Sequence, residues 1–127
     1  TTKIITSEPF NLSSYKSGSL STDKIYTGNS VPFLLQNLAK FSSYKTIYLF
    51  GVDHYPNHLN NSNSNFKGYK GRGVKNLDMT QQKLEYIEGL FEYSLECCHN
   101  QSIALYNVTP NTHLEVIPKY NSKRNSL

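Results

Sequence analysis

The stretch from Thr46 to Phe50 is largely apolar without alternation and ends abruptly at Gly51. A strand that is covered on both faces has this pattern, which is typical of parallel α/β sheets. Because such sheets bind ligands beyond the carboxyl ends of their strands, we expect Asp53, His54 and Tyr55 to lie at a site. The alternative is an ordinary polar turn, since glycine, aspartate and proline are common turn residues.

Two further segments have the apolar spacing of amphipathic helices. The turn from Thr27 to Ser30 precedes the first helix, where Asn29 or Ser30 is a candidate cap and Pro32 suits the first helical turn. The second helix is predicted from Asp78 or Thr80 to about His99. The apolar positions are Val31, Leu34, Leu35, Leu38 and Phe41 in the first helix, and Leu84, Ile87, Phe91, Leu95 and Cys98 in the second.

Other parts of the chain predict short strands and irregular segments. Ser13–Ser21 is rich in serine and predicts a loop or linker without a packing pattern. His113–Tyr120 predicts a short closing helix or an irregular tail, because Pro118 limits the length of a helix there. The strand candidates are Lys3–Thr6, Lys24–Tyr26 and Ile103–Tyr106, the last of which ends at the polar residues Asn107 and Thr109.

The segment from residue 52 to residue 77 has no periodicity, and we expect it to form a long mobile loop. It contains the basic run Lys67–Lys75, with four cations and three glycines. The backbone and charges of this run could close over a phosphate as a lid. The alternative is a flexible, solvated loop.

The order of these segments predicts a single α/β domain over residues 1–127, with a Rossmann-like parallel sheet flanked by helices in three layers. A chain of this length fits one domain. On that geometry the turn Thr27–Ser30 and the strand tips at Asp53 and Asn107 share one edge of the sheet. Three polar tips on one edge predict a pocket.

The composition adds limits on the class of protein and its partners. The mean hydropathy of −0.54 is low, but ten Tyr and six Phe supply large apolar surfaces, so we expect a folded protein. The net charge of +4 and the pI of about 9.0 favour anionic partners. The basic residues form no amphipathic stripe and no nucleic-acid-binding motif is present, so we expect no nucleic-acid partner.

The two cysteines, Cys97 and Cys98, are adjacent in the second predicted helix. Their side chains point about 100° apart and cannot easily pair, so we expect free thiols and a cytoplasmic, reducing environment. No apolar stretch approaches the ~18 residues that span a bilayer, and no signal sequence is evident, so we expect a soluble protein without a transmembrane segment. Pro56 disfavours a shared helical face for His54 and His58, and we expect no structural metal.

The polar residues at the strand tips could support several chemistries. Asp53 could accept hydrogen bonds from a ribose, or could cap a turn. His54 could act as a general base, although a lone histidine is more often structural. Tyr55 could donate its hydroxyl to a leaving-group phosphate, and the backbone N–H groups of Gly28–Ser30 could face an anion.

Three segments resemble the C-terminal half of an uncharacterised family of bacterial polysaccharide-locus proteins: Thr27–Pro32, Ile47–Tyr55 and Leu105–Val116. That family is similar to the bacterial sialyltransferases that modify lipooligosaccharide, to flagellar motility accessory factors and to the methanopterin-pathway diphosphokinase group. The resemblance covers about Lys24 to Tyr120. It implies a Rossmann-like fold and a transferase that uses an activated sugar nucleotide, most simply a CMP-sugar.

The resemblance also implies roles for individual residues. In the sialyltransferases the stretch that matches Gly51–Asp53 lines the nucleotide site, the turn that matches Thr27–Gly28 faces the nucleotide, and a Tyr that matches Tyr55 assists phosphate departure. The general-base His of those enzymes precedes the long helix, where residues 70–76 of this chain contain no His. The His-Phe pair of the uncharacterised family is Asn65–Phe66 here.

The leading hypothesis is a sugar-nucleotide-dependent glycosyltransferase-like domain in surface polysaccharide synthesis, with a sugar nucleotide and a glycan acceptor as partners and no cofactor beyond the donor. One alternative is a non-catalytic nucleotide-binding or assembly module, which the missing His supports. Another is a pterin diphosphokinase-like enzyme, which would need Mg²⁺, ATP and more paired acids. The chain opens at Thr1 and lacks a Gly-Asn-Gly-Pro-Ser-like loop, so it resembles one half of a larger protein. Homo-oligomerisation stays open.

Overall fold

The computed structural model describes residues 5–21, 23–53 and 81–120. Helices and strands alternate along the chain, and the strands pair in parallel, β1 with β2 and β3 with β4. The architecture is therefore mixed α/β with parallel strand pairs, as the sequence predicts. The elements are β1 (Thr6–Pro9), α1 (Leu12–Lys16), β2 (Lys24–Thr27), α2 (Ser30–Phe41), β3 (Thr46–Leu49), α3 (Gln81–Asn100) and β4 (Ala104–Asn107).

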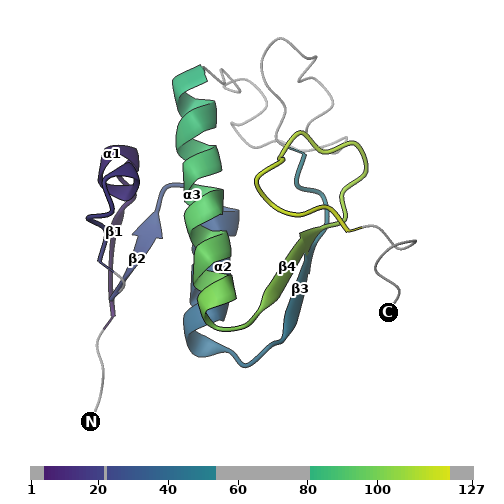
Figure 1. Ribbon diagram of the computed structural model, residues 1–127, viewed down its shortest axis with the longest axis horizontal. Helices are drawn as coiled ribbons and strands as arrows, with labels where there is room; N and C mark the ends of the chain where they lie inside the picture. Colours follow the sequence, from purple (N-terminus) through teal and green to yellow (C-terminus); the bar gives the residue numbers. More distant parts are fainter. Residues whose placement is uncertain (1–4, 22, 54–80, 121–127) are drawn as a thin grey trace, which may run out of the picture.

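The strands of the described part form two separate two-stranded sheets, so the predicted three-layer Rossmann-like sheet is not confirmed. In Figure 1 the pairs β1–β2 and β3–β4 lie on either side of α3. This helix packs directly against α2. The prediction of one sheet assumed that consecutive strands lie side by side, which is the usual arrangement. Here α2 packs against β2 and α3, and β3 does not pair with β2.

A buried glutamine closes the edge of β2 that faces away from β1. The Thr27 carbonyl accepts a hydrogen bond from the Phe10 N–H at 2.9 Å, so the preceding carbonyl, that of Tyr26, points toward the opposite edge. There Gln36 of α2 engages both backbone groups of Tyr26. Its Oε1 accepts from the Tyr26 N–H at 2.7 Å, and its Nε2 donates to the Tyr26 carbonyl at 3.0 Å. Gln36 thus takes the place that a neighbouring strand would have at Tyr26.

Helix α3 is buried on two faces, because one hydrophobic cluster lies on each side of it. Phe91 and Cys98 belong to a cluster shared with α2, β3 and β4. Leu90 and Tyr93 belong to a second cluster shared with the β1–β2 side. The predicted apolar face is right, because Leu84, Phe91 and Cys98 are buried, and Ile87 and Leu95 pack against the first cluster. The sequence does not predict the burial of Leu90 and Tyr93, because the apolar spacing of this helix indicates only one buried face.

Helix α2 begins at Ser30, in agreement with the predicted turn, but its buried face differs from the predicted one. Leu35 and Ala39 are buried, whereas Leu34 is 54% exposed and Phe41 is 65% exposed. Apolar residues surround much of this helix, so their spacing alone could not select a face. The contact with α3 and the Gln36 bonds to β2 select it instead.

The serine-rich segment Ser13–Ser21, which the sequence predicts as a loop, begins within α1, so the prediction is wrong for residues 13–16 and right for residues 17–21. The side chain of Asn11 accepts a hydrogen bond from the Ser14 N–H at 2.9 Å and caps the helix. Leu12 and Tyr15 pack against the second cluster. A Cβ at Gly89 of α3 would lie 2.5 Å from the end of the Leu12 side chain, so a larger residue there would force that side chain to move.

The strand predictions hold to within one residue for β2, β3 and β4, but Phe50, at the end of the strand that was expected to be covered on both faces, is 78% exposed. Strand β2 contains all of Lys24–Tyr26, and β4 begins one residue after the predicted start. Strand β1 begins at Thr6, where the prediction ended, and Lys3 lies outside the described residues. Of the two alternatives for the tail, the irregular one is confirmed. The Asn107 N–H donates to the Pro118 carbonyl at 2.8 Å, which places the tail beside β4.

Candidate functional site

Side-chain hydrogen bonds tie the carboxyl end of β3 to that of β4. After β3 the chain turns at Gly51, whose φ of +80° favours glycine. The next N–H group, that of Val52, donates to Thr109 Oγ1 at 2.9 Å. Asn107 Nδ2 donates to the Val52 carbonyl at 3.2 Å. The structure thus brings together three of the residues that the sequence singles out: Gly51, Asn107 and Thr109.

Thr112, which the sequence did not single out, completes this network. Its hydroxyl donates to the Val52 carbonyl at 2.6 Å and accepts from Asn107 Nδ2 at 3.3 Å. Asn107 Oδ1 accepts from the Thr109 N–H at 3.1 Å. The three side chains are buried, and their polar groups bond mainly to backbone. They therefore position the strand tips, as satisfied buried polar groups commonly do.

Asp53 follows the joined tips and is held through its backbone. Its carbonyl accepts from the His113 N–H at 2.8 Å and lies 3.3 Å from the Thr112 hydroxyl, whose hydrogen is directed mainly at the Val52 carbonyl. The side chain is half-buried, and its carboxylate takes no part in these bonds. A carboxylate held beyond the carboxyl ends of parallel strands can accept hydrogen bonds from ribose hydroxyls.

The turn from Thr27 to Ser30 leads from β2 into α2. Gly28 has a φ of +146°, and a Cβ there would meet the hydroxyl of Tyr86, whose pKa burial raises. Asn29 precedes the helix and makes no side-chain capping bond, and Ser30 is exposed in the first turn. The turn therefore leaves the positive end of α2 accessible at Ser30. Because β2 and the β3–β4 pair belong to separate sheets, the turn and the strand tips do not share one sheet edge as predicted, and among the described residues no hydrogen bond joins them.

The remaining predicted site residues cannot be placed. His54 and Tyr55, the predicted catalytic pair, lie outside the described residues. So do residues 54–77 of the expected mobile loop, including the basic run Lys67–Lys75.

A cavity of about 940 Å³ lies at the other end of the described fold, where the sequence predicted no site. Its walls come from the end of α1, the residues before β2, the end of α2 and the second half of α3. Asp23 marks the wall at β2, Phe41 the wall at α2, and Asn100 the wall at α3. Because these residues begin a strand and end two helices, the cavity lies away from the strand tips that hold Asp53.

Tyr15 and two glutamates of α3 form the polar centre of this cavity. Tyr15 Oη lies 3.0 Å from Glu92 Oε1 and 2.9 Å from Glu96 Oε1. Burial, followed by the hydrogen bonds to Glu96 and Glu92, holds the pKa of the Tyr15 phenol far above its usual range. The phenol therefore stays protonated at neutral pH and acts as a hydrogen-bond donor.

A second aromatic residue and a thiol lie next to this centre. The rings of Tyr15 and Tyr93 meet edge to face, with centroids 5.8 Å apart. Burial also raises the pKa of Tyr93 and that of the Cys97 thiol, and Lys40 opposes the change at Cys97. Both cysteines are free, as the sequence predicts. The raised pKa makes Cys97 a poor nucleophile at neutral pH.

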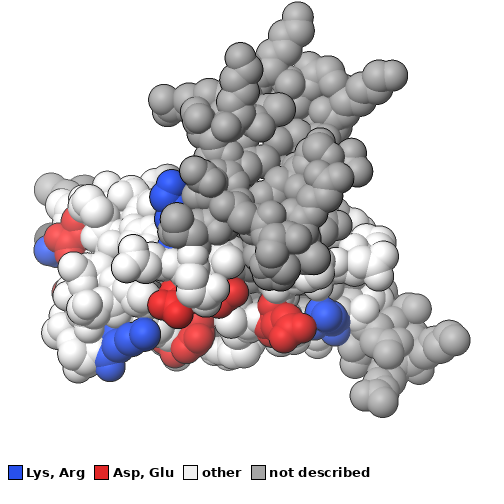
Figure 2. Space-filling model, turned by 90° about the horizontal axis from the view of Figure 1, so that it is seen from above, with Lys and Arg blue, Asp and Glu red and all other residues white. Residues whose placement is uncertain are grey.

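The sequence held one signal for the cavity. Glu85, Glu88, Glu92 and Glu96 recur at intervals of three and four residues, which places them on one side of α3. Figure 2 shows a row of acidic side chains along one edge of the molecule, with basic side chains at both ends of the row. The partner of two of these glutamates, Tyr15, lies in the segment that was predicted as a loop, so their meeting could not be foreseen.

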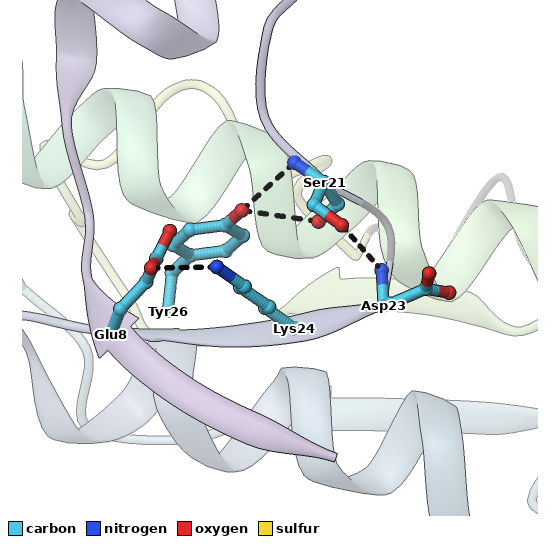
Figure 3. Close-up of polar contacts among 5 residues, drawn as sticks. All are labelled: Glu8, Ser21, Asp23, Lys24 and Tyr26. Atoms are coloured by element: carbon cyan, nitrogen blue, oxygen red, sulfur yellow. Dashed lines mark hydrogen bonds and ion pairs between the residues drawn. The ribbon is translucent and has the colours of Figure 1, made fainter. Parts of the chain in front are cut away.

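Polar contacts fix the chain where it enters β2, beside the cavity (Figure 3). The Tyr26 hydroxyl accepts from the Ser21 N–H at 2.9 Å and donates to the Ser21 carbonyl at 3.1 Å. Ser21 Oγ accepts from the Asp23 N–H at 3.2 Å. The Lys24 ammonium and the Glu8 carboxylate pair at 2.9 Å across the two strands, which raises the pKa of Lys24. These contacts set the position of Asp23 in the cavity wall.

The described residues contain neither a metal-binding cluster nor a membrane-spanning helix. Within residues 5–21, 23–53 and 81–120, no group of three or more His, Cys, Asp or Glu side chains could hold a metal ion. None of the helices described has both the length and the apolar character needed to cross a membrane. No protein-family model matches the chain, and comparisons with curated proteins and with solved structures found no match.

Proposed function

We propose that the joined tips of β3 and β4 bind the nucleotide of an activated sugar, most simply a CMP-sugar, in a glycosyltransferase-like domain for surface polysaccharide synthesis. The observation that carries this proposal is the position of Asp53. Its backbone is fixed by the His113 N–H, beyond the carboxyl ends of two parallel strands. Parallel α/β folds bind nucleotides at such positions.

The proposal includes a Rossmann-like relationship for the fold. Parallel strands joined by helices are the building units of Rossmann-like folds, and this chain contains two such pairs. Gln36 closes β2 on the side where a continuous sheet would extend. On this proposal the chain keeps the parallel strand–helix–strand units of a Rossmann-like fold, but its sheet is not continuous past β2.

The proposed roles follow from the chemistry of each residue. Asp53 accepts hydrogen bonds from the ribose, and Gly28–Ser30 direct backbone N–H groups of α2 toward an anion. Asn107 and Thr109 position the tip through their bonds to backbone. His54 and Tyr55, which follow Asp53 in the sequence, are assigned the base and the aid to phosphate departure.

A non-catalytic binding module of the same fold is the second candidate. Asn107 and Thr109 favour it, because their polar groups hold backbone at the place where a transferase would contact its substrate. The two candidates differ in one measurement. A transferase releases CMP from the CMP-sugar in the presence of a glycan acceptor, whereas a binding module holds the nucleotide without releasing it.

Isothermal titration of the full chain with CMP, a CMP-sugar and UDP tests the proposal. We expect binding of CMP and the CMP-sugar, and a loss of about tenfold in affinity in Asp53→Asn, because a carboxylate is a stronger acceptor for hydroxyls than an amide. Asp23→Asn is the matched control, since Asp23 lies in the wall of the distant cavity. Absence of binding by all three ligands, or equal losses in the two variants, would contradict the proposed nucleotide site.

A further inference from the structure

The cavity bounded by α1, α2 and α3 has the size and lining of a small-molecule site. Its volume of about 940 Å³ falls in the range of roughly 300 to 1,000 Å³ that is typical of such sites. Leu20, Ala39 and Phe41 supply apolar surface, and the rings of Tyr15 and Tyr93 add aromatic surface. The cavity is separate from the strand tips, so a ligand here would be additional to the proposed nucleotide.

Tyr15 cannot donate a hydrogen bond to both of the neighbouring glutamates at once. The phenol has a single hydrogen, yet its oxygen lies within 3.0 Å of a carboxylate oxygen of Glu92 and of Glu96. Tyr15 can donate to only one of them at a time. Glu92 and Glu96 are exposed, so water donates to the other carboxylate in the absence of a ligand, and a donor bearing positive charge could replace that water and bridge the acceptors.

The charges of the lining also favour a cation over an anion. Three carboxylates line the cavity, those of Asp23, Glu92 and Glu96, against the two ammonium groups of Lys16 and Lys40. The aromatic rings next to the glutamates attract cations as well. A primary ammonium group has three N–H donors and no acceptor, which matches the three oxygen acceptors that meet at Tyr15, Glu92 and Glu96.

We propose that this cavity binds a small molecule that carries a primary ammonium group on an apolar body. The ammonium group lies between Glu92, Glu96 and the Tyr15 oxygen. The apolar body lies against Tyr93 and the apolar wall. The walls come from four separate elements, so an occupant would also hold α1 and β2 against α3.

The test follows the backbone amide signals of the full chain by NMR while hexylamine is added at neutral pH. We expect saturable shifts for residues near Tyr15 and in the second half of α3, with a Kd in the millimolar range that suits so small a ligand. Hexan-1-ol, which has the same apolar body without the charge, should bind at least about tenfold more weakly. Equal binding of the alcohol, or no saturable shift with the amine, would overturn the proposal.

Variants locate the ammonium group. Glu92→Gln and Glu96→Gln should each weaken hexylamine binding about tenfold, since each replaces a charged acceptor by a neutral one. Glu85→Gln is the matched control, because Glu85 is exposed on the same helix like Glu92 and Glu96 but does not line the cavity. An equal loss in Glu85→Gln would show only general attraction to an acidic helix and would overturn the assignment.

Tyr15→Phe is a second test, in which the charge of the cavity lining does not change. It keeps the ring that packs against Tyr93 and removes the oxygen that joins the two glutamates. We expect weaker hexylamine binding and little change in hexanol binding. Amine binding as tight as that of the unaltered chain would contradict a role for the hydroxyl. The far-UV circular dichroism of every variant establishes that it is folded.

Discussion

Cys97 and Cys98 are neighbours in the sequence with different surroundings in the fold. Cys98 has no exposed surface and lies in the cluster that contains Leu35 and Leu105. Cys97 is half-buried beside Tyr93. Burial raises the pKa of Cys98 from 9.0 to about 11, with a further contribution from Cys97. The folded state therefore favours the protonated thiol more strongly than the unfolded state does.

At the residue scale this shift predicts a pH dependence of stability. Because the folded pKa of Cys98 is raised, its contribution is complete below pH 9 and is lost as the pH rises toward 11. Cys98→Ala removes that contribution, so the difference in free energy of unfolding between the original chain and the variant should fall by on the order of 1 kcal/mol over this interval. Urea unfolding at several pH values measures the difference. A difference that stays constant with pH would contradict the burial of the thiol.

Some residues of the candidate site follow from the sequence and others do not. Asp53 and Asn107 stand out because each is a polar residue that directly follows an apolar run. Thr112 and Tyr15 have no such neighbours, since one belongs to an irregular tail and the other to a serine-rich segment. Their roles depend on contacts with residues 60 and 77 positions away in the chain, which no local pattern encodes.

At the scale of elements, the sequence predicts the long helix and the short strands well, because their apolar periodicity is local. It predicts less well which side of a helix is buried. Leu34 and Phe41 are seven residues apart and Leu35 and Ala39 are four apart, and both are helical spacings, so only the packing of α2 on α3 and β2 distinguishes the exposed pair from the buried one. Gln36 was absent from the predicted core because a buried amide is expected only where bonding partners exist.

Gln36 is expected to be the most sensitive polar residue of α2. In Gln36→Leu the side chain keeps its size, but the Tyr26 N–H and carbonyl lose their partners while buried. Each unsatisfied group costs about 1 to 3 kcal/mol, so we expect a loss of roughly 2 to 5 kcal/mol in the free energy of unfolding. Urea unfolding followed by circular dichroism measures it.

The neighbouring amide of α2 is the control for this prediction. Asn37 Nδ2 donates to the Phe33 carbonyl at 2.8 Å within the same helix, on the more exposed side. Asn37→Leu should change the free energy of unfolding by less than about 0.5 kcal/mol, as surface substitutions usually do. Similar losses at the two positions would mean that Gln36 does not support β2.

At the scale of the whole molecule, the described fold is organised around α3. The helix contributes Phe91 to one hydrophobic cluster and Leu90 to the other, so neither cluster is complete without it. The division into two sheets was beyond prediction from local patterns, because it depends on one side chain of α2 reaching the edge of β2.

This shared helix predicts that the two sheets unfold together. Leu90→Ala and Phe91→Ala each remove a large buried side chain and should each cost about 2 to 5 kcal/mol. The backbone amide NMR signals of Tyr26 and Leu105, which belong to different clusters, can follow the two sides separately during unfolding. We expect the two signals to share one midpoint in urea for the original chain and for both variants. Separate midpoints would show that the two clusters are independent units.

The glutamine at the edge of β2 also limits how molecules of this protein can associate. A free strand edge offers unpaired N–H and carbonyl groups to a strand of another chain, which is a common route to aggregation. A strand that approached β2 from the side away from β1 would find both groups of Tyr26 already bonded to Gln36. It would have to displace a fully buried side chain first. The same residue that ends the sheet inside the molecule therefore protects this edge against growth of the sheet between molecules.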